Sequence, residues 1–132
     1  MSRENLELLQ RGFERWNAGD LEAALEVVAD DMRWYPGSVF LDDDELYEGK
    51  QGMRDYFASF EEPWEWIMVE PLEQEEIGDH IAVRARFRAR SNEGVDVDIQ
   101  VGQRWTFRHG LLIEFHGYPS YAEAVEAARG AP

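Results

Sequence analysis

Residues 11–34 read RGFERWNAGDLEAALEVVADDMRW, and this stretch encodes two helices, a tight corner and the entry to a strand. Apolar side chains recur at spacings of three and four, which predicts one buried stripe on a helix over residues 4–17. Gly12 interrupts this helix at a cost of about 1 kcal/mol relative to alanine, so we expect another backbone to approach closely there. The apolar stripe consists of Leu6, Leu9, Phe13 and Trp16.

A corner follows the first helix. Gly19 suits the left-handed conformation after a helix end, and the Asp20 carboxylate can cap the next helix by accepting backbone N–H bonds. Residues 32–35 then read as a short strand that Pro36 and Gly37 stop. The second helix, between the corner and this strand, carries the apolar residues Leu21, Ala24, Leu25 and Val28.

The composition is that of one small domain spanning residues 1–132. A chain without cysteine has no disulfide framework and no thiolate nucleophile. No apolar run approaches the ~20 residues of a membrane span, and the first residues lack the apolar core of a secretory signal. We therefore expect a cytoplasmic protein folded around one core.

The formal net charge of −15 argues against nucleic-acid and membrane-surface partners, because both are anionic and are bound through basic patches. We interpret the scattered acidic residues as a solubilising surface. The densest acidic run, Asp42 to Glu45, lacks the alternating ligands and the central glycine of a calcium loop. We expect no bound metal and no cofactor.

The rest of the chain predicts a third helix, four strands and a short last helix. His80 and His109 fall at turns, where we expect them to be solvated. Helices followed by successive strands predict an α+β domain, with the helices packed on one face of a curved, mostly antiparallel sheet. The third helix covers 53–60 and ends at Pro63, the strands cover 64–76, 80–91, 95–107 and 111–118, and the last helix covers 121–128.

Residues 80–91 show the clearest alternation, with apolar side chains on one face and arginines on the other. Residues 95–101 have Asp96 and Asp98 at alternate positions, so a hairpin between the two strands would place arginines opposite aspartates. An arginine cluster that binds phosphate or carboxylate groups is the alternative. The four arginines are Arg84, Arg86, Arg88 and Arg90.

Six short segments carry a resemblance to the SnoaL-like branch of the nuclear transport factor 2-like (NTF2-like) superfamily. It implies a cone-shaped α+β roll with three N-terminal helices, a pocket between those helices and the concave sheet, and a homodimer through the outer sheet face. The superfamily includes ketosteroid isomerases, polyketide cyclases and epoxide hydrolases, so the fold alone identifies no activity. The segments are residues 2–5, 16–21, 47–49, 78–79, 105–110 and 123–128, and they span nearly the whole chain.

Resemblance to the ketosteroid isomerases implies a tyrosine on the first helix and two aspartates on strands. Here Gly12 stands at the tyrosine position, Trp34 or Tyr35 near the base and Gln103 at the second acid. The aspartate pair and bridging arginine of the epoxide hydrolases are not visible either. Residues 103–106 also lack the histidine that relatives often carry at this point. We expect neither of these mechanisms.

Polar residues on the late strands are the candidates for catalysis. Continuing the inward alternation predicts that Gln103, Glu114 and His116 face the helices. A carboxylate in an apolar cavity has a raised pKa, which would make Glu114 a proton shuttle beside His116, with Gln103 donating a hydrogen bond to a substrate oxygen. Resemblance to SnoaL-type polyketide cyclases also implies an acidic residue on a late strand, and Glu114 is its nearest counterpart.

The predicted ligand-binding residues are mostly aromatic, and packing in a closed core is the alternative role for each. Two functions stay open. The chain either binds a small, largely apolar, oxygenated molecule and acts on it through Glu114, His116 and Gln103, or is a non-catalytic ligand-binding or dimeric interaction module. A cavity of at least ~300 Å³ that reaches Glu114 and His116 would favour the first. The ligand-binding candidates are Phe13, Trp16, Trp34, Tyr35, Phe57, Phe60, Val101, Trp105 and Tyr118, with Trp64 and Trp66 as further aromatic candidates.

Overall fold

A single mixed sheet organises the molecule. The computed structural model describes residues 2–36, 46–59 and 64–130, and these form a six-stranded sheet in the order β2-β1-β6-β5-β4-β3. The last four strands of the chain pair as antiparallel neighbours, whereas β1 pairs in parallel with β6. The strands are β1 (Val28–Tyr35), β2 (Tyr47–Glu48), β3 (Trp64–Ile77), β4 (His80–Ser91), β5 (Asp96–Arg108) and β6 (Leu111–Tyr118).

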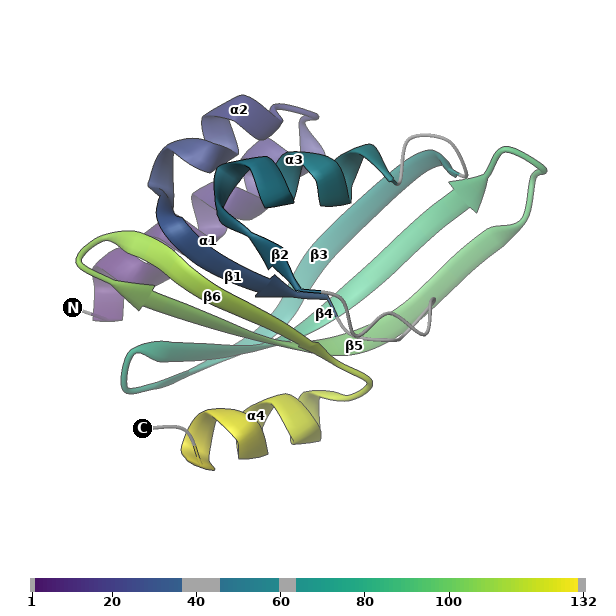
Figure 1. The fold of residues 1–132 in the computed structure, drawn as a ribbon. Coiled ribbons are helices and arrows are strands. Elements are labelled where there is room, and N and C mark those ends of the chain that lie inside the picture. Colours follow the sequence, from purple (N-terminus) through teal and green to yellow (C-terminus); the bar gives the residue numbers. More distant parts are fainter. Residues whose placement is uncertain (1, 37–45, 60–63, 131–132) are drawn as a thin grey trace.

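Helices cover both faces of the sheet, but unequally (Figure 1). The first three helices lie over one face, called here the inner face, and the last helix lies across β4 and β5 on the outer face. This arrangement confirms the predicted α+β class, with a fourth helix in addition to the three at the N-terminal end. The helices are α1 (Ser2–Asn17), α2 (Leu21–Ala24), α3 (Gly49–Ala58) and α4 (Tyr121–Gly130).

The corner between α1 and α2 follows the sequence prediction. Gly19 has a φ of 78°, and Asp20 Oδ1 accepts a hydrogen bond of 3.2 Å from the Ala23 backbone N–H. The second helix is shorter than predicted, because the chain tightens into a 3-10 turn at Leu25–Val27 and Val28 already belongs to β1. Two successive valines favour extended backbone over helix.

Asn17 fastens the end of α1 to the edge of the sheet. Its Nδ2 donates to the Val69 carbonyl at 2.8 Å and its Oδ1 accepts from the Val69 N–H at 3.1 Å. β3 is an edge strand, so these backbone groups have no partner strand on that side. The side chain thereby holds α1 above the inner face.

The third helix starts earlier than predicted, at Gly49 instead of Met53. Gly49 has a φ of 66°, and a Cβ there would lie 2.7 Å from the Asp30 carbonyl oxygen. A glycine is therefore required where α3 turns away from β1. The predicted end of this helix, at Phe60 and Pro63, lies outside the described residues.

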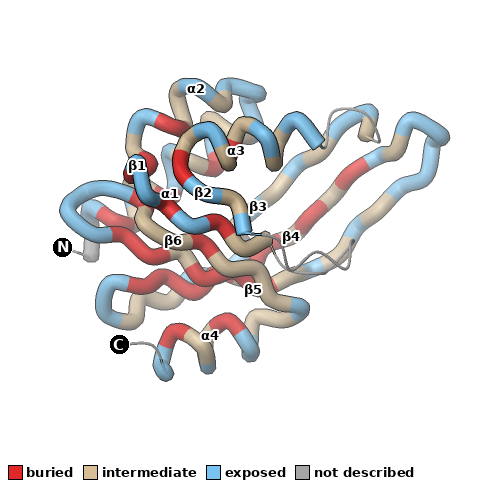
Figure 2. Tube along the Cα trace, in the orientation of Figure 1, coloured by how far each residue is buried: buried red, intermediate tan, exposed pale blue. Residues whose placement is uncertain are grey.

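Buried residues line the middle of the sheet (Figure 2). The main core lies between α1, α3 and the inner face, and a second cluster of Ala82, Ala124 and Ala128 lies beneath α4. Gly102 allows α4 to approach β5 closely, since a Cβ there would lie 2.0 Å from the Ser120 carbonyl oxygen. The outer face is therefore tightly closed at α4.

Two of the four arginines of β4 pair with aspartates across the hairpin, as predicted; Arg84 instead pairs with Glu73 of β3, and Arg88 contacts Met68. Arg86 and Asp98 approach to 2.6 Å, and Arg90 and Asp96 to 2.8 Å. These ion pairs lie on the outer face, beyond α4. Within the part of the chain that the structure describes, no helix has the length and apolar character needed to cross a membrane.

Candidate functional site

A cavity of about 170 Å³ lies between the helices and the inner face. Among the described residues that line it, none is charged. An apolar cavity of roughly 150 Å³ holds a benzene-sized molecule, so this one suits a compact ligand of one or two rings. The lining includes Leu8, Leu9, Gly12, Phe13, Trp16, Trp34, Met53, Tyr56, Phe57, Ile67, Val69, Phe87, Val101, Gln103, Trp105, Phe107, Phe115 and Tyr118.

Aromatic rings form most of the cavity wall. Trp34 stacks on Phe115 with 3.8 Å between ring centroids. Trp16 from α1 lies against Phe57 from α3, with their centroids 4.0 Å apart. The helices and the sheet thus each contribute flat apolar surface, which favours a planar ligand.

Gly12 forms an open part of the α1 wall. A Cβ built at this position meets no atom of the described residues within 4 Å, and the residue lines the cavity. The expectation that another backbone approaches here is wrong. The missing side chain instead leaves space in the cavity, which offers a reason for a glycine in the middle of a helix.

Gln103 is the only residue with an amide side chain among the described residues that line the cavity. Its Oε1 accepts a hydrogen bond of 3.0 Å from Trp105 Nε1, and within the described ranges its Nε2 has no acceptor. Two further donors in the wall, Trp16 Nε1 and Trp34 Nε1, are buried and unpaired among those same residues. The two indole nitrogens have almost no accessible surface, so the unused donor that the cavity offers is the Gln103 amide.

Glu114 and His116 lie on the outer face, so their predicted orientation toward the helices is wrong. The pairing of β5 with β6 shifts between Thr106 and Phe107, where Thr106 faces Glu114 and Phe107 faces Leu112. Ile113 is the extra residue of this bulge. A bulge reverses the alternation of the following residues, so Phe115 joins Trp105 on the inner face.

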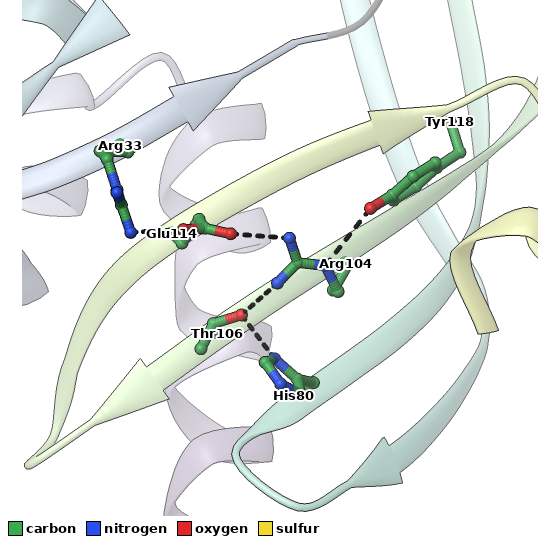
Figure 3. A network of polar contacts seen from close by, with 6 residues as sticks. All are labelled: Arg33, His80, Arg104, Thr106, Glu114 and Tyr118. Atoms are coloured by element: carbon green, nitrogen blue, oxygen red, sulfur yellow. Dashed lines mark hydrogen bonds and ion pairs between the residues drawn. The ribbon is translucent and has the colours of Figure 1, made fainter. Parts of the chain in front are cut away.

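Glu114 belongs to a polar network that crosses the outer face from β1 to β4 (Figure 3). It accepts hydrogen bonds of 2.9 Å from Arg33 and 2.7 Å from Arg104. Arg104 also donates to Thr106 at 3.0 Å and to the Tyr118 hydroxyl at 3.3 Å. The side chain of Arg104 is only 10% exposed, so its charge depends on these partners.

The network keeps Glu114 ionised. Burial raises the pKa of Glu114, but the hydrogen bond from Arg104 and the charges of Arg104 and Arg33 outweigh it, so the pKa lies below its usual value. We predicted a raised pKa, and the structure shows the opposite. Burial also lowers the pKa of His116, which favours the neutral imidazole. Glu114 therefore lacks the raised pKa expected of a proton shuttle inside the cavity.

His80 ends the network and corrects another expectation. The side chain is buried, and its Nδ1 lies 2.7 Å from Thr106 Oγ1. We expected a solvated turn residue, but the turn is confined to Gly78 and Asp79, and His80 is the first residue of β4. His109, by contrast, is exposed at the turn between β5 and β6.

Most of the predicted ligand-binding residues line the cavity. Tyr35 does not: it stacks on His116 with centroids 4.9 Å apart. Phe60 lies outside the described residues, and Trp64 and Trp66 border a separate hollow beside Trp16 and Phe57. The residues that line the cavity are Phe13, Trp16, Trp34, Phe57, Val101, Gln103, Trp105 and Tyr118.

Several lining residues were missed by the sequence analysis. Tyr56 and Met53 lie on α3 with Phe57, and Phe115 is the apolar residue between Glu114 and His116. Taking Phe115 as the inward residue would have placed β6 correctly. Among the described residues, no cluster of three or more His, Asp or Glu side chains is arranged to hold a metal ion.

Comparisons with known proteins agree with this fold. Residues 9–115 match the model of the SnoaL-like domain. No curated protein matches the chain.

Solved structures match over almost the whole chain. An NTF2-like protein of unknown function from Burkholderia pseudomallei has 19% identity and a TM-score of 0.80, and the match covers 97% of this chain and 98% of that one. TerC, crystallised with polyporic acid, has 17% identity and a TM-score of 0.79, covering 96% and 99%. A putative SnoaL-like polyketide cyclase from Jannaschia sp. has 20% identity and a TM-score of 0.77, covering 98% and 94%. At these identities the likeness shows the fold.

Proposed function

The chain belongs to the SnoaL-like domain family, and we propose that it binds a small, largely apolar molecule carrying an oxygen atom. The observation that carries this proposal is the uncharged, aromatic-lined cavity with one amide in its wall. Ligand sites are typically concave and mostly apolar, with a few polar groups that orient the ligand. TerC, which shares the fold, was crystallised with polyporic acid.

Gln103 is the proposed polar contact. The residue is 9% exposed, and a ligand oxygen that accepts from its Nε2 would satisfy a donor that has no acceptor among the described residues. In a reaction, the same amide would stabilise negative charge on a carbonyl oxygen. Catalysis stays a prediction, because the cavity is smaller than ~300 Å³ and neither Glu114 nor His116 lines it. We therefore leave those two residues out of the proposed site.

Filling the cavity from Gly12 tests the proposal. Gly12→Leu places an aliphatic side chain in the open space, and leucine is a better helix former than glycine by roughly 0.8 kcal/mol. We expect the variant to remain folded and to lose binding of 1-indanone, a two-ring ketone, in an NMR titration. Gly12→Ala is the matched control and should keep binding.

Two results would overturn the proposal. Unchanged 1-indanone binding by Gly12→Leu would place the ligand elsewhere, and absence of binding by the wild type would remove the ligand-binding role. Mass spectrometry of the protein purified under native conditions is an independent measurement. A co-purified small molecule would support the ligand-binding role.

We also propose a homodimer through the outer sheet face. Trp66 and Met68 of β3 are 43% and 39% exposed, and they lie opposite Arg90 and Arg88 of the arginine face. Large exposed apolar residues on a sheet commonly mark an interaction surface. Light scattering should give twice the chain mass, and Trp66→Glu should give a monomer. Val95→Glu, at an exposed turn, is the control, and a monomeric wild type would contradict the proposal.

A further inference from the structure

The Gln103 side chain is held in one orientation by its neighbour on the same strand. We propose that Trp105 is a positioning residue that makes Gln103 a hydrogen-bond donor toward the cavity, so that the site selects neutral ligands carrying a hydrogen-bond acceptor. This inference rests on the proposed function, since it concerns the ligand of the same cavity. It adds the chemical class of the ligand and names Trp105 as the residue that determines this class.

The orientation follows from the chemistry of the two side chains. An indole N–H can only donate, whereas an amide donates from nitrogen and accepts through oxygen. The atom that lies 3.0 Å from Trp105 Nε1 must therefore be Gln103 Oε1. A rotated amide would bring two donors together, so the nitrogen end is left for the ligand.

Trp105 itself is fixed by three rings. Its ring centroid lies 4.6 Å from that of Phe115, 5.5 Å from Phe13 and 5.7 Å from Trp34. These neighbours come from β6, α1 and β1, so the indole is packed from the helix side and from the sheet side. Its N–H direction is consequently set by packing rather than by the amide.

The rest of the lining supports the same selectivity. The unpaired donors Trp16 Nε1 and Trp34 Nε1 add no acceptor, and no carboxylate lines the cavity within the described ranges. The nearest charged network lies on the other face of the sheet, where Arg104 is already engaged by Glu114 and Tyr118. An ionised ligand would lose its hydration without gaining a counter-charge.

The ligand class is thus a compact, neutral, mostly apolar molecule with a carbonyl or ether oxygen. A ligand whose only polar group is an N–H donor would meet the Gln103 amide N–H, which is also a donor. Among the described side chains that line the cavity, the Tyr56 hydroxyl is the alternative acceptor. The Tyr118 hydroxyl belongs to the outer-face network, where it accepts from Arg104 Nε.

The test compares three two-ring probes of similar size. 1-Indanone carries an acceptor, indole carries an N–H donor, and indane carries neither. The measured quantities are two ratios of dissociation constants from NMR titration, indane over 1-indanone and indole over 1-indanone. A net hydrogen bond corresponds to a difference of about fivefold, and ratios cancel any general change in cavity volume.

Three variants separate positioning from packing. Gln103→Leu should lower both ratios about fivefold by removing the donor. Trp105→Phe should lower the indole ratio about as much, because the freed amide can turn its oxygen toward the probe. Phe57→Leu alters the cavity wall without touching either residue, and should leave both ratios unchanged.

The outcomes distinguish the two proposals. If indane and 1-indanone bind but Trp105→Phe keeps the wild-type ratios, or Phe57→Leu changes them equally, the selectivity inference is overturned and cavity binding stands. If none of the three probes binds the wild type, both fail together. Binding of a carboxylated indane as tightly as 1-indanone would also overturn the claim of neutral-ligand selection.

Discussion

The two faces of the same strands differ in how their polar groups are satisfied. On the outer face, most arginines pair directly with acids, from Arg90 and Asp96 at one end to Arg33 and Glu114 at the other. Arg88 Nε and His116 Nδ1 are the buried atoms of that face without a partner among the described residues. On the inner face, the Gln103 amide nitrogen and two indole N–H groups have no acceptor among the described residues. Alternation of side chains along each strand produces both surfaces from one sequence.

The difference shows where a ligand is expected. A face whose charges already pair gains little from a new polar partner, whereas an apolar face with unpaired donors gains a hydrogen bond from any suitable acceptor. We therefore expect ligand binding at the inner face, where the few polar groups are neutral, and not at the outer face, where the charged residues lie.

The largest expected effect contrasts two glycines. Gly102→Ala should destabilise the fold by about 3 kcal/mol, because its Cβ would lie 2.0 Å from the Ser120 carbonyl oxygen and α4 must move. Gly12→Ala should stabilise it by about 1 kcal/mol, since the Cβ there meets nothing and alanine favours helix. Urea unfolding measures both. Equal stabilities for the two variants would contradict the contrast between a closed and an open face.

The next effect concerns the outer network. Glu114→Gln should cost about 2 kcal/mol, because Arg104 keeps a largely buried charge and loses its anionic partner. Binding of 1-indanone should stay at the wild-type level, since Glu114 does not line the cavity. Glu93→Gln at an exposed turn is the control. If Glu114→Gln keeps full stability but no longer binds 1-indanone, Glu114 belongs to the ligand site and the prediction is wrong.

A smaller effect is expected from acid. The pKa of folded His116 is lowered from 6.5 mainly by burial, so the unfolded chain takes up the proton first and stability declines as the pH falls below 6.5. Glu114 adds a second loss as the pH falls below 4.5, because its folded pKa is also lowered.

Thermal unfolding between pH 7.5 and 4 measures this dependence. The groups that face or interact with His116 are Tyr35, Tyr118, Arg104 and Glu114. His116→Asn should remove the first decline, whereas His109→Asn should keep it. Persistence of that decline in His116→Asn would assign it to another group.

The smallest effect is expected on the arginine face. Asp98→Asn removes an exposed partner of Arg86, and exposed ion pairs contribute little to stability. The unfolding midpoint should stay at the wild-type value at 0.5 M salt. A midpoint shift as large as that of Glu114→Gln would contradict this prediction. It would show that exposure does not determine how much the Arg86–Asp98 and Arg104–Glu114 pairs contribute to stability.

The elements with strong periodicity were predictable from the sequence. The stripe of Leu9, Phe13 and Trp16 predicted α1. The alternation in residues 80–91 predicted β4, with one buried apolar face and one face of arginines. Local chemistry also placed the corner, because Gly19 and Asp20 each have one dominant conformational role. These features depend on residues close in sequence, which is what periodicity records.

The candidate site was predicted only in part, and the reason lies in β6. Residues 111–113 are all apolar, so their side chains do not reveal which of them faces the core. A bulge at Ile113 then reverses the alternation and moves Glu114 outward. A bulge depends on pairing with β5, which is a long-range contact. The cavity-facing aromatics were easier to predict, since size and apolarity suffice to bury them.

The parallel pairing of β1 with β6 has a consequence for how the chain folds. Arg33 and Glu114 are 81 residues apart in sequence, whereas β3 to β6 are joined by short turns. Closing the longer loop costs more chain entropy, so we expect the four-stranded meander to form before β1 docks. Since β1 supplies Trp34, the cavity would be completed only in the last stage of folding, and a ligand would stabilise the native state without speeding its formation.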